Sequence, residues 1–210
     1  MNKPKDVDEY ITMHKAAVSQ NPECGNSHYN LAVGYVGQRR YEEAERELHA
    51  ALECSPNLAE AYVLLGGICL SRGDLEGCLD YNRKAVKVRP GFSEGYGNIG
   101  FVELQRGNVD EAIKNFERAT TFNFRYVQAF ANLGNAYLMK GMVEEAITAN
   151  RKAITLAPDF APAYNNLTIA FLEKGEYALA VEHYDKAVAL GFDVAAPIRQ
   201  EIEGHRAKLK

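Results

Sequence analysis

Apolar residues recur along this chain at steps of three and four, which is the spacing of one face of an α-helix. Tyr62, Leu65, Gly66 and Cys69 show that spacing. The helical stretches are interrupted by glycines, which adopt positive φ at helix ends, and by prolines, which cannot continue a helix. The pattern therefore predicts an all-α protein built from pairs of helices. The interrupting residues are Gly73, Gly107, Gly141 and Gly175 within the pairs, and Pro56, Pro90 and Pro158 after them.

The same pattern returns every 34 residues without insertion or deletion. The twenty-seventh position is alanine in all five copies, and the eighth is small in most of them. Small residues at such positions let two helix backbones approach closely. We therefore predict five structural units, at residues 25–58, 59–92, 93–126, 127–160 and 161–194.

These units resemble the tetratricopeptide repeat (TPR) family. Each copy carries a variant of aromatic-x-x-L-G-x-x-aromatic, then two small residues, and three copies end in proline. The resemblance implies a right-handed superhelix of antiparallel helix pairs, whose first helices line a concave groove. With one helix added at each end, we expect about twelve helices. Stability in such a repeat array comes from the interfaces between neighbours.

Both ends of the chain lie outside the five units. Residues 1–24 align with the second helix of a unit whose first helix is absent, and Tyr10 takes a position that is small in the other units. That helix is either a cap or an edge to which a second molecule docks. Residues 195–210 are predicted to form a capping helix, with Ile198, Ile202 and Leu209 facing inward and Arg199, Glu203, Arg206 and Lys208 facing outward.

Several residues depart from the family pattern. Asn82 and Asn150 occupy position 24, an aromatic position in the family, and Cys69 and Glu103 occupy another at position 11. We expect them to be partly exposed or locally hydrogen-bonded; the alternative is a polar recognition pocket. A cluster of Phe122, Phe124 and Tyr126 is expected to pack between units, unless it is exposed as a second contact surface.

Composition narrows the function. The net charge of −4 provides no electrostatic attraction to nucleic acid or to anionic membranes. No stretch approaches about 18 uninterrupted apolar residues, so we expect no membrane insertion. The charged N-terminus lacks the apolar run of a signal peptide, and the four cysteines form no C-x-x-C pair. A reduced protein in the cytoplasm is expected.

Residues typical of catalysis or cofactor binding do not form a recognisable set. The five histidines are scattered, and the phosphate-binding and nucleophile motifs of enzymes are missing. Cys69 and Cys78 are interpreted as a packed thiol pair, because a metal site needs about four ligands. We therefore predict that the chain is not an enzyme and that it holds no cofactor or metal.

The TPR resemblance implies that positions 2, 5, 6, 9, 12 and 13 of each first helix face the groove. These positions carry no Lys or Arg, and their charged residues are Glu60, Glu94 and Glu173. The cationic clamp of chaperone-binding TPR proteins is therefore disfavoured. The asparagines are similar to the ladder in the TPR superhelix of O-linked N-acetylglucosamine transferase, although they could instead bridge helices. The predicted peptide-groove residues are Asn30, Val33, Asn98, Phe101, Leu104, Asn132, Asn135, Leu138, Asn165 and Asn166.

An amide side chain can pair with a peptide backbone whatever the peptide's own side chains are. The sequence thus predicts a protein–protein interaction scaffold or adaptor, which binds a peptide that is apolar and tolerates basic residues. Two alternatives remain open. One is a self-assembling organising scaffold, resembling the magnetosome-associated TPR protein at family level. The other is a regulatory module of a separate enzyme, such as a glycosyltransferase system.

Overall fold

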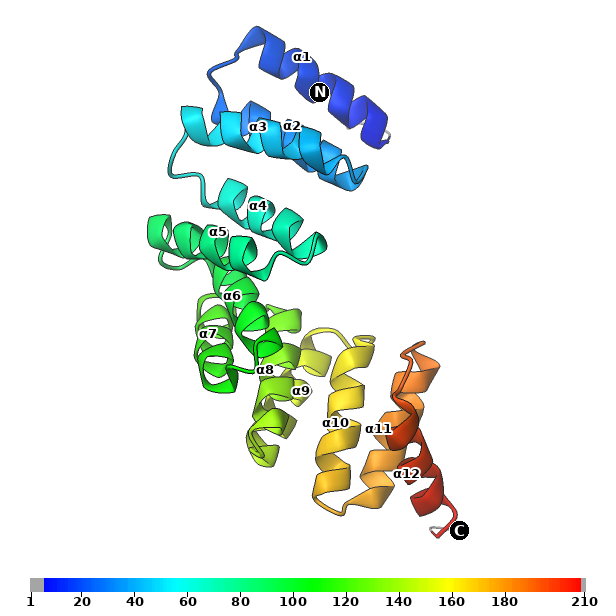
Figure 1. The fold of residues 1–210 in the computed structure, drawn as a ribbon. Coiled ribbons are helices and arrows are strands. Elements are labelled where there is room, and N and C mark those ends of the chain that lie inside the picture. The colour runs from blue at the N-terminus through cyan, green and yellow to red at the C-terminus, as the bar shows by residue number, and fades with distance from the viewer. Residues whose placement is uncertain (1–5, 209–210) are drawn as a thin grey trace. The chain divides into compact units, whose positions relative to one another are not determined.

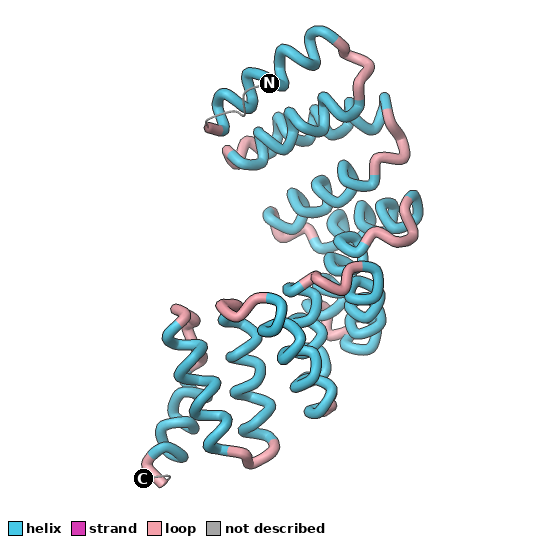
Figure 2. Tube along the Cα trace, turned by 180° about the vertical axis from the view of Figure 1, so that it is seen from behind, coloured by secondary structure: helices cyan, strands magenta, loops and turns pink. Residues whose placement is uncertain are grey.

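The computed structural model describes residues 6–208 of the chain, and within them it contains helices and no strand (Figures 1 and 2). The all-α prediction is confirmed. Residue Leu209, expected on the inner face of the last helix, lies outside the described residues. The helices are α1 Val7–Gln20, α2 Gly25–Gly37, α3 Tyr41–Cys54, α4 Ala59–Ser71, α5 Leu75–Val88, α6 Ser93–Gln105, α7 Val109–Phe122, α8 Val127–Met139, α9 Val143–Leu156, α10 Ala161–Glu173, α11 Tyr177–Ala189 and α12 Ala196–Arg206.

The helices follow the 34-residue period of the sequence. First helices start at Gly25, Ala59, Ser93, Val127 and Ala161, a spacing of 34 residues. The glycines that end four of them adopt φ between +73° and +78°, the left-handed conformation that glycine reaches without strain. In the first unit Arg39 takes this position with φ 58°. The five unit boundaries themselves remain our proposal.

Second helices pack on their own first helix and on the next one where these contacts fall within one compact unit. The contacts of α2 with α3, of α4 with α5, of α8 with α9, and of α9 with α10 show both kinds of neighbour. First helices also touch each other, since α8 contacts α10. The alanines at positions 20 and 27 are fully buried in the described helices, as Ala146 and Ala153 illustrate. Small side chains thus allow the close helix contacts on which the fold depends.

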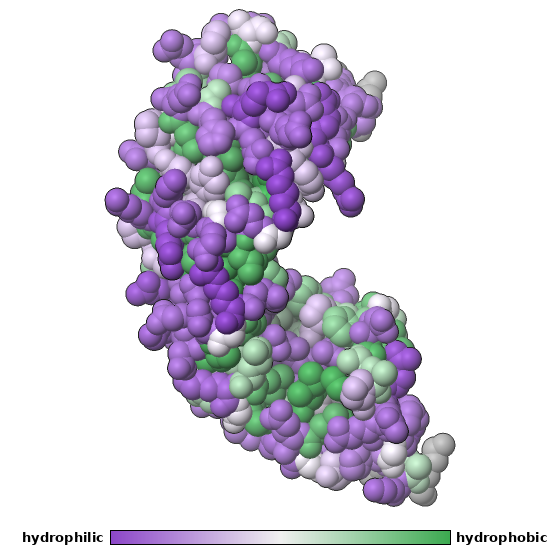
Figure 3. Space-filling view, viewed as in Figure 1, coloured by the Kyte–Doolittle hydropathy of each residue, from purple (hydrophilic) through white to green (hydrophobic). Residues whose placement is uncertain are grey.

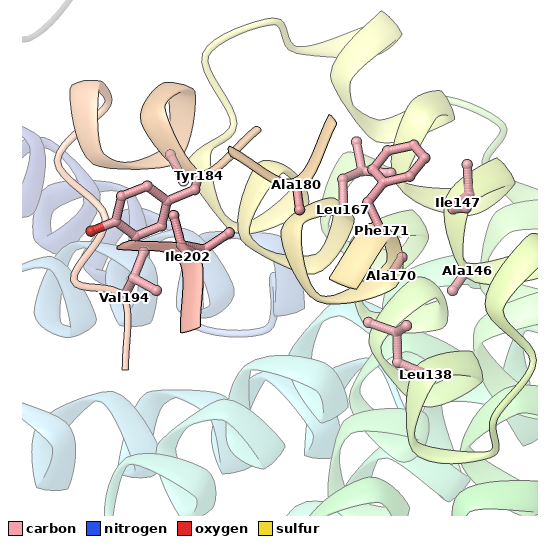
Figure 4. Packing of buried hydrophobic residues seen from close by; sticks show 11 residues of the cluster. Leu138, Ala146, Ile147, Leu167, Ala170, Phe171, Ala180, Tyr184, Val194 and Ile202 are labelled. Atoms are coloured by element: carbon pink, nitrogen blue, oxygen red, sulfur yellow. The ribbon is translucent and has the colours of Figure 1, made fainter. Parts of the chain in front are cut away.

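The chain divides into two compact units, residues 1–102 and 103–210, and the division falls within α6. The core of the first unit includes Leu31, Leu48 and Leu65. The core of the second unit runs from Leu138 through Phe171 to Ile202, and Figure 4 shows these side chains converging between their helices. In Figure 3 hydrophilic residues predominate on the visible surface, with hydrophobic patches between them.

Two terminal helices cover the outermost pairs. On α1, Ile11 is buried against α2, and the ring of Tyr10 lies beside Gly34. On α12, Ile202 is fully buried in the cluster that contains Val194 and Tyr184. These contacts support our proposal that both helices act as caps. No helix in the described part of the chain has the length and apolar character needed to cross a membrane.

Arg206 lies elsewhere than expected. We predicted an outward-facing side chain, but its guanidinium donates two hydrogen bonds to the carboxylate of Asp185 on α11, at 3.0 and 2.5 Å, and is only partly exposed. A bidentate pair of this kind fixes geometry more strongly than a single contact. Arg206 lies one helical turn after Ile202, on the same face of α12, so the pair adds a polar tie between α12 and α11 beside the apolar contact.

Candidate functional site

The position-6 asparagines of the predicted groove have different surroundings. Asn166 on α10 is buried, and its Nδ2 donates to the carbonyl of Ala131 at 3.0 Å and to Oδ1 of Asn150 at 3.1 Å. Asn98 on α6 donates in the same way to Oδ1 of Asn82 at 3.0 Å. In these two units the asparagine connects one repeat to the preceding one. This is the bridging role that the sequence left open.

The asparagines at position 24 complete these connections. Asn82 and Asn150 are fully buried, and each Nδ2 donates to the backbone carbonyl four residues earlier, at 2.7 and 2.8 Å. They are therefore locally hydrogen-bonded, as expected, but not exposed. A Cβ at Gly66 or Gly134 would overlap the amide of Asn82 or Asn150. We call each set of glycine, position-24 asparagine and following position-6 asparagine a Gly–Asn–Asn lock.

The other groove amides are less constrained. Asn132 on α8 accepts a hydrogen bond from Nε2 of Gln128 at 2.8 Å, within its own helix. Asn30 and Asn135 are half-buried. The Oδ1 atom of Asn165 is buried and has no hydrogen-bond partner among residues 6–208. The amides of Asn30, Asn132 and Asn135 therefore retain donors or acceptors for a ligand, whereas the buried Oδ1 of Asn165 is not accessible to one.

The apolar residues of the predicted groove also separate by exposure. Val33 is 37% exposed and Phe101 is half-buried, whereas Leu104 and Leu138 are each only 8% exposed. The latter two pack in the structure rather than line an open surface. Ile169 and Leu172, at equivalent positions on α10, are half-buried and extend the apolar surface of the second unit.

One of the three groove carboxylates is neutralised within the protein. Arg89 donates two hydrogen bonds to Glu60, at 2.5 and 3.0 Å. Partial burial alone would raise the pKa of Glu60, but the hydrogen bond and charge of Arg89 hold it below its ordinary value. Glu94 accepts a hydrogen bond from the hydroxyl of Ser93 at 2.8 Å. Glu173 is exposed at the end of α10.

The cysteines and other potential ligands do not assemble into a metal site. Within the described part of the chain, no group of three or more His, Cys, Asp and Glu side chains is arranged to hold a metal ion. Cys69 and Cys78 are buried in one hydrophobic cluster. Burial, with the nearby Cys69, raises the pKa of the Cys78 thiol to about 11. Both thiols thus remain protonated and serve as packing groups.

The sequence did not reveal that Asn98 and Asn166 form hydrogen bonds with Asn82 and Asn150 of the preceding repeats. The available signal was the combination of glycine at position 8 with asparagine at position 24, which occurs at Gly66 with Asn82 and at Gly134 with Asn150. Gly100, however, occurs together with Phe116, so the glycine alone does not identify a lock.

Solved structures of TPR-type proteins share this fold. YrrB, described as a TPR protein with an unusual peptide-binding site, is 22% identical with a TM-score of 0.68, over 86% of this chain and 93% of YrrB. MamA is 26% identical with a TM-score of 0.66, over 76% of this chain and 94% of MamA. The Cut9–Hcn1 structure of the APC/C is 18% identical with a TM-score of 0.81, over 94% of this chain but only 39% of the other.

Sequence comparison points to the same family. No curated protein matches this chain. Models described as tetratricopeptide repeat match residues 29–91 and 127–160, and a model described as TPR repeat matches residues 100–141. Repeats of this type are in general non-catalytic modules for protein–protein interaction, and the matched segments together span more than half of the sequence. The chain belongs to the tetratricopeptide repeat family.

Proposed function

We propose that this protein is a non-catalytic scaffold that binds a peptide segment along the face formed by its first helices. The observation that carries the proposal is the second unit, where α8 and α10 contact each other. Their groove positions present Asn132, Asn135 and Ile169, each of which is half-buried and open to a further contact. Amides beside aliphatic side chains suit a peptide backbone that carries apolar residues.

The locks restrict which amides take part. The donors of Asn98 and Asn166 are engaged with Asn82 and Asn150, so these two asparagines position the first helices rather than contact the peptide through Nδ2. The amides of Asn132 and Asn135 lie on one helix, at positions 6 and 9, and supply the polar contacts. Leu104 and Leu138 are buried and do not contribute exposed contacts to the proposed surface.

Charge favours a basic or neutral peptide. With Glu60 bound by Arg89, the groove carboxylates left to attract a partner are Glu94 in the first unit and Glu173 in the second. The predicted preference for basic residues is thus retained, but it rests on fewer acidic groups. An exposed ion pair between one of these carboxylates and a basic residue of the peptide adds only about 0–1 kcal/mol. The apolar contacts and the amides therefore contribute most of the affinity.

The test is affinity capture followed by mass spectrometry, with the full chain as bait. We expect Asn132→Ala with Asn135→Ala to lose partners that the wild-type protein retains, because each lost hydrogen bond weakens binding by about 0.5–1.5 kcal/mol. The matched control is Thr148→Ala with Thr155→Ala, two exposed residues of the second helix α9. Equal capture by both double variants would contradict the proposal.

Self-association is a second candidate, favoured by one observation in the first unit. A pocket of about 420 Å³ between α1 and α2 is lined by Val7, Tyr10, Val33, Gly34 and Gly37. Val7 is 43% exposed, and the pocket occupies the side on which a further first helix would pack. Light scattering of the full chain and of a chain lacking residues 1–22 tests this candidate. Oligomers that persist after the deletion would contradict it.

A further inference from the structure

Two cysteines lie on chain segments that contact each other, where α2 begins and α3 ends. Cys24 directly precedes α2, and Cys54 is the last residue of α3. A Cβ on Gly25 would lie 2.8 Å from the Cβ of Ser55, so the two chain segments are in contact. The thiol of Cys54 donates to the carbonyl of Pro22 at 3.7 Å, two residues before Cys24.

The surroundings of a histidine near these segments favour its positively charged form. Nδ1 of His28 lies 2.6 Å from Oε2 of Glu47, and Nε2 lies 2.9 Å from the carbonyl oxygen of Pro22. A carboxylate and a carbonyl only accept, so these two partners favour the doubly protonated imidazolium, in which both ring nitrogens donate. Burial alone would lower the pKa of His28, but these two hydrogen bonds and the charge of Glu47 raise it overall.

The surroundings of Cys24 favour its thiolate. The backbone N–H of Ser27 donates to the carbonyl oxygen of Cys24 at 2.9 Å. The polar groups of Ser27, and to a lesser extent Asn26, at the start of α2 lower the pKa of Cys24 against the opposing effect of burial. The imidazolium of His28 acts in the same direction. Glu47, which is paired with His28, and the adjacent Glu23 are the nearby acidic groups. A thiolate in such surroundings is the reactive form of cysteine.

We propose that Cys24 and Cys54 form an oxidant-responsive dithiol site, at which hydrogen peroxide oxidises Cys24 and Cys54 then closes a disulfide. The Cys24 thiolate attacks one peroxide oxygen, the O–O bond breaks, and the departing hydroxide takes up a proton. The Cys54 sulfur then attacks the sulfenic sulfur, the S–O bond breaks, and the departing hydroxide takes the Cys54 proton. Two thiols and one peroxide thus give one disulfide and two waters.

The other two cysteines of the chain provide an internal reference. Cys69 is 8% exposed and Cys78 is fully buried, and burial raises the pKa of both thiols. Neither presents a thiolate to a peroxide. Selective oxidation at Cys24 is therefore distinguishable from general oxidation of the chain.

The experiment treats the full chain with one equivalent of hydrogen peroxide at neutral pH and analyses it by mass spectrometry without reductant. We expect a mass loss of about 2 Da and a peptide cross-linked through Cys24 and Cys54. Cys54 and Cys69 share one tryptic peptide, so fragmentation must locate the bond. A disulfide that involves Cys69 or Cys78, or a sulfenic acid that persists at Cys24 in the wild-type protein, would overturn the proposal.

Variants separate the two roles. In Cys54→Ser the reaction should stop at the sulfenic acid of Cys24, which dimedone traps, whereas Cys24→Ser should leave Cys54 reduced. Ser27→Ala should slow alkylation of Cys24 by iodoacetamide while circular dichroism remains unchanged. We expect Cys24 in the folded chain to be alkylated about threefold faster, or more, than in the urea-denatured chain. Equal rates in the two states would overturn the activation of Cys24.

Discussion

The repeat interfaces of this protein fill one position in two different ways. In the first, third and fifth of the 34-residue repeats, position 24 carries Leu48, Phe116 and Tyr184, and all three side chains are buried in the apolar core. In the second and fourth repeats this position carries Asn82 and Asn150, which are also buried. The fold thus tolerates a polar side chain at this position when its hydrogen bonds are satisfied.

The difference has a consequence for the neighbouring repeat. A large apolar side chain makes no directional demand, whereas Oδ1 of a buried asparagine needs a donor. Asn98 and Asn166 supply it from the next first helix. A polar residue at position 24 therefore gives the groove asparagine of the next repeat a structural role. The candidate peptide contacts are then asparagines such as Asn132, which belong to no lock.

The largest effect is expected from Asn150→Leu, which breaks the lock on one side. Asn166 then loses one of its two acceptors while it remains buried, and the lost hydrogen bonds and disturbed packing should lower the free energy of unfolding by about 2–4 kcal/mol. Urea denaturation measures it. Asn166→Leu added to this variant should restore part of the loss, because no donor is then left unpaired. A double variant as unstable as the sum of its single changes would contradict the coupling.

Replacing either of two adjacent glycines of α4 by alanine should change the stability of the protein, in opposite directions. A Cβ at Gly66 would overlap the amide of Asn82, whereas one at Gly67 meets nothing within 4 Å. Gly66→Ala should destabilise the protein by about 1–3 kcal/mol because the lock must shift. Gly67→Ala should stabilise it by about 0.5–1 kcal/mol through helix propensity. Thermal melts of both variants give the signs, and destabilisation by both would show that Asn82 is not the cause.

The two position-6 asparagines of the second unit should differ as well. Asn166→Ala removes two hydrogen bonds in a buried setting and should cost about 1–3 kcal/mol of stability. Asn132→Ala removes a contact within one helix and should change the stability by less than about 0.5 kcal/mol. Urea unfolding of the matched pair provides the measurement. Similar losses would mean that Asn132 also has a structural role.

The 34-residue spacing was sufficient to predict the all-α TPR fold, because helix periodicity and helix breaks are local properties of a sequence. It also indicated which residues share a helix face. It could not identify their partners: Glu60 binds Arg89, 29 residues away, and Arg206 binds Asp185 instead of facing outward. Such pairs depend on side-chain direction across an interface. The locks could not be predicted from the sequence for the same reason, since Asn82 and Asn98 belong to different repeats.

The smallest effect we predict concerns two histidines in opposite surroundings. His28 stands at position 4, where the other units have an aromatic residue, and its hydrogen bonds raise its pKa overall against the effect of burial. His183 lies near the rings of Phe171 and Tyr164, and burial, assisted by the charge of Arg151, lowers its pKa. An unfolded histidine titrates near about 6.5.

The two groups should therefore give pH dependences of opposite sign. The stabilisation by His28 is fully present below the pKa of the unfolded residue and is lost as the pH rises through the raised pKa of the folded state. His183 destabilises the fold when the pH falls below its unfolded pKa, because the unfolded chain then binds the proton more readily. Thermal melts of His28→Gln and His183→Gln at about pH 5.5 and about pH 8 compare the two sides of the pKa of an unfolded histidine. His28→Gln should be more damaging at the acidic pH and His183→Gln at the alkaline pH, whereas shifts in the same direction would show that the His28 ring is not held as an imidazolium.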